Sequence, residues 1–71
     1  MNMNEYLAAE LAKNNAGEQQ AIEDYLRLLN IQGMSKELAD DVREIISDEM
    51  NHSQKLSMWI EKLTGIKPAK D

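Results

Sequence analysis

Apolar residues recur at alternating spacings of four and three along almost the whole chain, with one interruption near its middle. This periodicity places them on one stripe of an α-helix and predicts two helices. The interruption runs from Asn30 to Ser35, where Gly33 suits a turn and Ser35 suits a helix N-cap. We therefore expect a helix over about 3–31, a turn over 32–35, a second helix over about 36–64 and a short tail over 65–71.

Capping residues support these boundaries. Asn2 can cap the first helix, with Glu5 three residues later as its reciprocal partner. Gly65 suits the left-handed position after the second helix, Ile66 suits the apolar contact that follows it, and Pro68 prevents the helix from resuming. The prediction is a single all-α domain, an antiparallel two-helix hairpin.

Length and composition limit how such a hairpin can be stable. The chain has 71 residues and no cysteine, so disulfides and thiolate-held metals are excluded. Metal held by oxygen and nitrogen ligands, self-association, or both remain. A net charge of −5 argues against nucleic acid and anionic membranes as partners. The N-terminus lacks the features of a signal peptide and no apolar run approaches the roughly 20 residues of a membrane span, so we expect a cytoplasmic protein.

The apolar stripe is wider than one hairpin can cover. The seam positions of the first helix are Leu7, Leu11, Asn14, Glu18, Ala21, Tyr25 and Leu28. Those of the second are Leu38, Val42, Ile45, Glu49, His52, Leu56, Trp59 and Leu63. Further apolar residues lie beside both seams, as in a helix that faces several neighbours. Two hairpins together would form a four-helix bundle, so we expect a homodimer.

Three polar residues interrupt this apolar seam: Glu18, Glu49 and His52. Glu18 and Glu49 are equidistant from the centre of the predicted turn, so they should face each other across the core. His52 follows Glu49 by three residues and lies on the same face, one turn away. Buried carboxylates are costly unless they are paired or bound to metal. Carboxylate and imidazole groups at one level suit non-haem iron or manganese, so these residues are predicted metal ligands.

Simpler interpretations of the same residues stay open. A Glu-x-x-His pair occurs often by chance, a seam histidine can be a satisfied core residue, and a seam glutamate can pair with a lysine or set the register of the helices. Asn14 and Asn15 flank the site and are candidates for hydrogen bonds to the ligands or for simple register polarity. Tyr25 lies two turns from Glu18 and suits the core better than the ligand shell, with a supporting contact to the site as the alternative.

The predicted ligands make half of a ferritin-like di-iron pattern, in which two helices each give a Glu and the other two each give Glu-x-x-His. Glu18 supplies one part and the segment from Glu49 to His52 supplies the other. A two-fold dimer would double them to four glutamates and two histidines, which balance the charge of two ferrous ions. We therefore expect two irons per dimer, with manganese or zinc as alternative metals.

Two segments, EQQAIEDY (18–25) and DEMNHSQKLSMWIEKL (48–63), resemble the encapsulated-ferritin family of the ferritin-like superfamily, whose chains are also helical hairpins. The points of similarity are Glu18, Ala21, Ile22, Tyr25, Glu49, His52 and Trp59. The resemblance implies a ferroxidase centre that Glu18, Glu49 and His52 form across a dimer. It also implies a ring of dimers that is loaded into an encapsulin nanocompartment.

The chain departs from that family near the site and at its end. Gly17 and Gln20 stand where the family has acidic residues that guide iron inward, and Asp24 stands where it has a tryptophan. The family usually continues into a further helix and a shell-targeting peptide, whereas this sequence ends at Asp71 with no clear targeting peptide. Ring assembly, shell loading and the iron entry route are therefore open questions.

The function predicted from these residues is oxidation of Fe(II) to Fe(III), with dioxygen or peroxide as the oxidant, in iron handling or storage. A rubrerythrin-like peroxidase that protects against oxidants is one alternative. A metal-free structural or adaptor hairpin with a polar register layer is another. Metal content separates the last interpretation from the first two, and product analysis separates the ferroxidase from the peroxidase.

Overall fold

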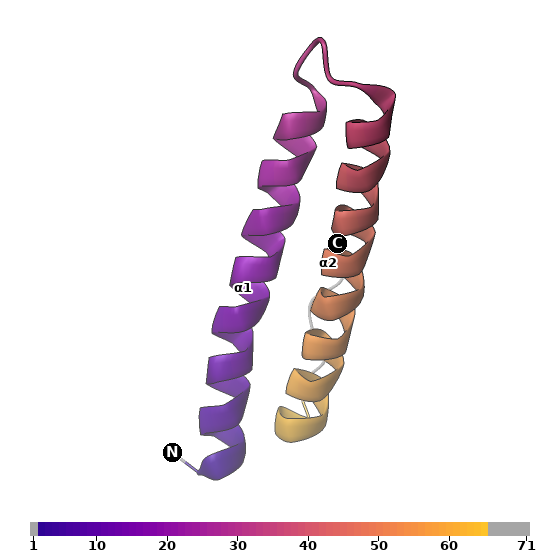
Figure 1. Ribbon diagram of the computed structural model, residues 1–71. Helices are drawn as coiled ribbons and strands as arrows, with labels where there is room; N and C mark the ends of the chain where they lie inside the picture. Colours follow the sequence, from indigo (N-terminus) through magenta and orange to yellow (C-terminus); the bar gives the residue numbers. More distant parts are fainter. Residues whose placement is uncertain (1, 66–71) are drawn as a thin grey trace.

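The protein is a hairpin of two antiparallel helices, α1 and α2, joined by a short turn (Figure 1). The computed structural model describes residues 2–65. Helix α1 spans Met3–Leu29 and begins as predicted. The side chain of Asn2 accepts a hydrogen bond from the backbone N–H of Glu5 at 2.8 Å, and its amide donates to the Glu5 carboxylate at 2.9 Å. This reciprocal pair satisfies a free N–H at the helix start.

Helix α1 ends at Leu29, two residues before the predicted end at Ile31. The reason is a tightening of the last turn. The backbone N–H groups of Asn30 and Ile31 donate to carbonyls three residues back rather than four, at Arg27 and Leu28. Gly33 then adopts a φ of 87°, a left-handed conformation that reverses the chain and that side chains disfavour.

Helix α2 spans Lys36–Thr64, and both of its ends lie where the sequence predicts them. The hydroxyl of Ser35 accepts from the backbone N–H of Leu38 at 3.1 Å. At the other end Gly65 has a φ of 74°, and its N–H donates to the carbonyl of Glu61 at 2.7 Å. The predicted contributions of Ile66 and Pro68 lie outside the described residues. Since the helices are antiparallel, the start of α1 and the end of α2 lie at the same end of the hairpin, opposite the turn (Figure 1).

One stripe along each helix packs against the other helix. Among the described residues its fully buried members are Ala8, Val42, Ile46 and Ser53. Half-buried residues flank them at helical spacing, including Leu11 and Ile22 on α1 and Leu56 and Ile60 on α2. The interface is therefore thin, as expected for a chain of this size.

The rest of the predicted seam stays exposed, because two helices can bury only one stripe between them. The exposed seam positions are Leu7, Asn14, Leu28, Leu38, Ile45, His52 and Trp59. They lie on one side of the hairpin, which we call the open flank. Its large apolar residues are Leu7, Leu28, Leu38, Ile45 and Trp59. Half of the surface of Trp59, for example, is accessible in the single hairpin. A stripe too wide for one hairpin was the prediction, and these exposures confirm it. In the described part of the chain, no helix has a stretch apolar and long enough to cross a bilayer.

Candidate metal centre

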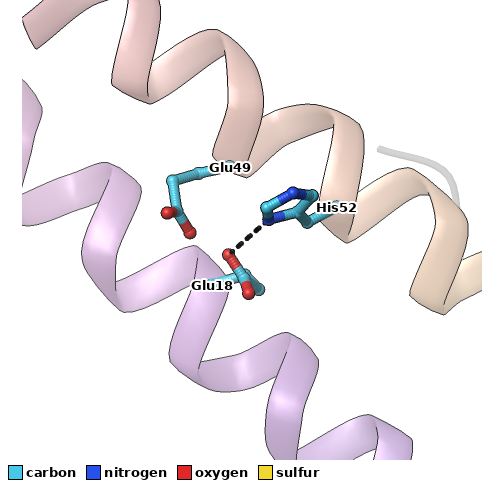
Figure 2. Close-up of side chains that lie close together, drawn as sticks. All are labelled: Glu18, Glu49 and His52. Carbon is cyan, nitrogen blue, oxygen red and sulfur yellow. Dashed lines mark ion pairs between the residues drawn. The ribbon is translucent and has the colours of Figure 1, made fainter.

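The structure brings Glu18, Glu49 and His52 together near the middle of the hairpin (Figure 2). Glu18 comes from α1, while Glu49 and His52 come from adjacent turns of α2, and the three side chains point toward one another. One ligand atom from each residue lies within 4.8 Å of the others. The two glutamates therefore face each other across the helix pair, as their equal distances from the turn predict. We call these three residues the carboxylate cluster.

The side chain of Glu18 is less exposed than that of His52, with 25% of its surface accessible against 58%. Its Oε2 atom is buried and has no hydrogen-bond partner among the described residues. The nearest polar atom of His52, Nδ1, lies 3.8 Å from it, which is an ion-pair distance and too long for a hydrogen bond. A buried carboxylate oxygen without a partner costs free energy, and a bound cation would remove that cost.

The dimensions of the cluster suit one small cation. Carboxylate oxygens and imidazole nitrogens bind such ions at about 2.0–2.2 Å, so two ligand atoms on one ion lie at most about 4.4 Å apart. The observed spread of up to 4.8 Å is wider than that value, so the side chains must move closer together to bind one ion. Two carboxylates and one imidazole form a donor set for iron, manganese or zinc, and three ligands leave positions free for other groups.

The carboxylate cluster opens into a groove of about 700 Å³ on the open flank. Gly17 lines this groove, and a Cβ at that position would meet no atom within 4 Å. Lys13 and Lys55 line it as well, and among the described residues the acidic members of the lining are Glu18 and Glu49 themselves. Trp59 forms part of the wall, and the Nζ atom of Lys62 lies 4.8 Å from the centre of its ring. Space beside the cluster is therefore available to ions and small molecules.

The three other candidate residues lie in different surroundings. Asn14 lines the groove beside Glu18. Asn15 points to the opposite side of the helix pair, where it hydrogen-bonds to Ser53 and Ser57 instead of to a ligand residue. Tyr25 is half-buried and belongs neither to the groove lining nor to the carboxylate cluster.

A second polar cluster, which the sequence did not reveal, crosses the helix interface at the same level. The amide of Gln19 donates to the hydroxyl of Ser53 at 2.6 Å, and that hydroxyl donates to Asn15 Oδ1 at 2.7 Å. The amide of Asn15 donates in turn to the hydroxyl of Ser57 at 3.4 Å. We call these four residues the amide–hydroxyl layer. Ser53 lies at the centre of this layer and is the one polar residue that is fully buried among the described residues.

The signal for this layer is a second heptad, offset from the predicted seam. It runs through Asn15, Ile22 and Leu29 on α1 and through Ile46, Ser53 and Ile60 on α2. These are the positions that the hairpin buries or half-buries. Serine and glutamine are common on helix surfaces, so their presence beside a seam does not by itself predict burial.

No family model matches this chain, and no curated protein or solved structure matches it either. The similarity to encapsulated ferritins therefore stays a prediction from the two segments that carry it. The features of the chain that bear on function are the carboxylate cluster and its surroundings.

Proposed function

We propose that two copies of this hairpin form a four-helix bundle with a di-iron site at its centre, and that the dimer is a ferroxidase. The observation that carries the proposal is the carboxylate cluster itself. Two glutamates and a histidine from two helices converge within 4.8 Å, and one carboxylate oxygen is buried without a hydrogen-bond partner in residues 2–65. Polar groups that served only packing would be expected to satisfy one another.

The dimer follows from what one hairpin leaves incomplete. Each chain offers three ligands, and a two-fold axis would bring four carboxylates and two imidazoles to one site. The groove beside Glu18 and the apolar residues of the open flank lie on the same side of the hairpin. A second copy placed there would cover the exposed apolar surface and enclose the cluster in one step.

Ferrous iron is the substrate in this proposal. Two Fe²⁺ ions each give one electron to dioxygen, which takes up two protons and leaves as hydrogen peroxide. The carboxylates of Glu18 and Glu49 favour this direction, because negative ligands stabilise the higher charge of Fe³⁺ more than that of Fe²⁺. The exposed His52 completes the ligand set on the groove side of the cluster.

Anaerobic titration with Fe²⁺, followed by mixing with dioxygen, tests the proposal. Wild-type protein should bind one iron per chain and form a ferric product with a rise in near-ultraviolet absorbance. Glu49→Ala and His52→Ala should each lose binding and oxidation while remaining helical by circular dichroism. Glu44→Ala is the matched control, because Glu44 is an exposed acid of α2 outside the groove lining.

The same experiment decides between the three interpretations of the sequence. Protein purified without chelator that holds no metal, and binds none, would identify a metal-free structural hairpin. Metal binding with turnover of hydrogen peroxide but without accumulation of ferric product would identify a peroxidase. Unchanged iron oxidation in the Glu49→Ala variant would show that the catalytic site lies elsewhere.

A further inference from the structure

The amide–hydroxyl layer lies beside the carboxylate cluster in the sequence and across from it in space. Gln19 directly follows Glu18, and Ser53 directly follows His52. Neighbouring residues of a helix point about 100° apart, so the two clusters occupy opposite sides of one helix interface. The residues that line the two hollows support this arrangement. The carboxylate cluster borders the groove on the open flank, whereas Gln19 and Ser53 border a separate hollow with Leu26 and Met50.

Hydrogen bonds in this layer interlock the two helices. Asn15 and Gln19 are four residues apart on α1, and Ser53 and Ser57 are four residues apart on α2. The Ser53 hydroxyl accepts from Gln19 and donates to Asn15, so it uses both of its roles across the interface. These bonds form only when the two helices have one axial alignment. Moving α2 by one turn, about 5.4 Å, would break all of them.

The apolar part of the interface discriminates between alignments less well. Aliphatic residues repeat along both stripes, so a shift by one turn replaces one aliphatic contact with another. A shift of that size would nevertheless separate Glu18 from Glu49 by more than the present 4.8 Å spread of the cluster. Metal sites lose affinity when ligand positions vary by much less than this, about 0.5 Å.

We propose that Asn15, Gln19 and Ser53 are positioning residues, whose hydrogen-bonded layer fixes the register of α1 against α2 and so sets the geometry of the carboxylate cluster. This inference rests on metal binding by that cluster, as proposed above. The layer acts through the backbone and touches neither metal nor substrate. A buried polar group that specifies register at some cost in stability is known from coiled coils.

The test replaces the layer with apolar residues in the triple variant Asn15→Leu/Gln19→Leu/Ser53→Ala. Of the layer, only the half-buried hydroxyl of Ser57 then remains, and it can donate to a backbone carbonyl of its own helix, so the fold should be as stable as wild type or more stable. Affinity for Co²⁺, followed by its visible absorbance, should nevertheless fall tenfold to a hundredfold, the range seen when groups that support metal ligands are lost. A loss of affinity without a loss of stability distinguishes positioning from simple stabilisation.

A second measurement reads the register directly in metal-free protein. The chain has no cysteine, so spin labels attach only at introduced sites. Glu23→Cys on α1 and Glu44→Cys on α2 are exposed positions for such labels. Their distance distribution, with labelled chains diluted in unlabelled ones, should be narrow in the wild-type background and broad or displaced in the triple variant.

Ser47→Ala is the matched control, since Ser47 is an exposed serine of α2 outside the layer. This substitution should change neither the Co²⁺ affinity nor the distance distribution of the labels. If the triple variant does not fold, Co²⁺ affinity and the spin-label distance are measured instead in the single variant Ser53→Ala, which removes the central hydroxyl. Unchanged Co²⁺ affinity together with an unchanged narrow distance would overturn the proposal. Wild-type protein that binds no Co²⁺ would instead refute the metal site, while the distance measurement would still decide whether the layer sets the register.

Discussion

The two polar clusters of this hairpin occupy the same level of the interface and differ in how their buried polar atoms are hydrogen-bonded. In the amide–hydroxyl layer, side chains from both helices satisfy one another, and Ser53 is buried with both of its hydroxyl roles used. In the carboxylate cluster, Glu18 Oε2 is buried with no hydrogen-bond partner among the described residues. His52 approaches it only to 3.8 Å.

This difference shows that side chains of the two helices can satisfy one another when a polar residue is buried between them. The unsatisfied oxygen of Glu18 is therefore the feature that supports the proposal of a bound cation. Charge separates the clusters too, because an amide and a hydroxyl can share hydrogen bonds, whereas two carboxylates repel each other until a cation lies between them.

The largest expected effect breaks the carboxylate cluster without changing its shape. Glu18→Gln should lower metal affinity at least a hundredfold, because the amide is a poor ligand for these ions. In the presence of chelator the same variant should unfold at higher urea, with a gain of about 1 kcal/mol, since the neutral amide no longer repels Glu49 and can donate a hydrogen bond to it. Metal titration and urea unfolding check the two parts. A variant that loses stability in chelator would contradict the contrast drawn between the clusters.

The next effect concerns the surface outside the carboxylate cluster. Ile45→Asp, on the open flank, should weaken the dimer about a hundredfold or more, because a loss of about 1.5 kcal/mol in each of two copies amounts to about 3 kcal/mol. Leu26→Asp is the control, as Leu26 is similarly exposed but borders the hollow next to the amide–hydroxyl layer. Sedimentation of both variants gives the result. Equal weakening by both would mean that the open flank is not the dimer surface.

Metal and self-association should also be linked. At a free Fe²⁺ concentration about a hundredfold above its dissociation constant, a site present only in the dimer stabilises the dimer by roughly 2.7 kcal/mol, or about a hundredfold in association. Anaerobic sedimentation of dilute protein with Fe²⁺, and again with chelator, measures this shift. The same mass distribution in both samples, with one metal bound per monomer, would refute a shared site.

The smallest effect is expected at Tyr25, which lies outside both clusters. No hydrogen bond of its hydroxyl is present within the described chain, so Tyr25→Phe should change the free energy of unfolding by less than about 0.5 kcal/mol. Iron stoichiometry should stay the same. Loss of iron in this variant would place Tyr25 in the site of the dimer.

Much of the fold could be predicted because its signals are local. Asn2, Ser35 and Gly65 determine three of the four helix ends through capping hydrogen bonds and a left-handed backbone. The fourth end, at Leu29, differs from its predicted position because hydrogen bonds between residues three apart tighten the final turn. No particular residue type is required for such bonds, so the sequence does not predict them. Glu18 and Glu49 could be placed near the same level from the turn, since residues equally distant from the turn of an antiparallel hairpin lie at about the same height.

The side of each helix that faces its neighbour was harder to predict. An apolar stripe wider than one interface offers two adjacent seams, and sequence periodicity does not say which seam closes inside the chain. The hairpin buries the positions through Ile46 and Ser53 together with part of the predicted seam, such as Val42, and leaves the seam positions Ile45 and His52 exposed. The amide–hydroxyl layer was missed for that reason, because its residues count as surface residues when the other seam is taken as the core.

The hairpin's antiparallel course has a consequence for how such a protein can evolve. Met3 at the start of α1 and Thr64 at the end of α2 lie at the same end of the molecule (Figure 1). In the proposed two-fold dimer, encoded by one gene, every substitution would occur twice, so a change at Glu18 would remove two of the proposed ligands together. Tandem duplication of the gene would release that constraint, because up-and-down bundles need only short connections between helices. Each half could then acquire its own ligands, and the two proposed metal positions would become chemically distinct.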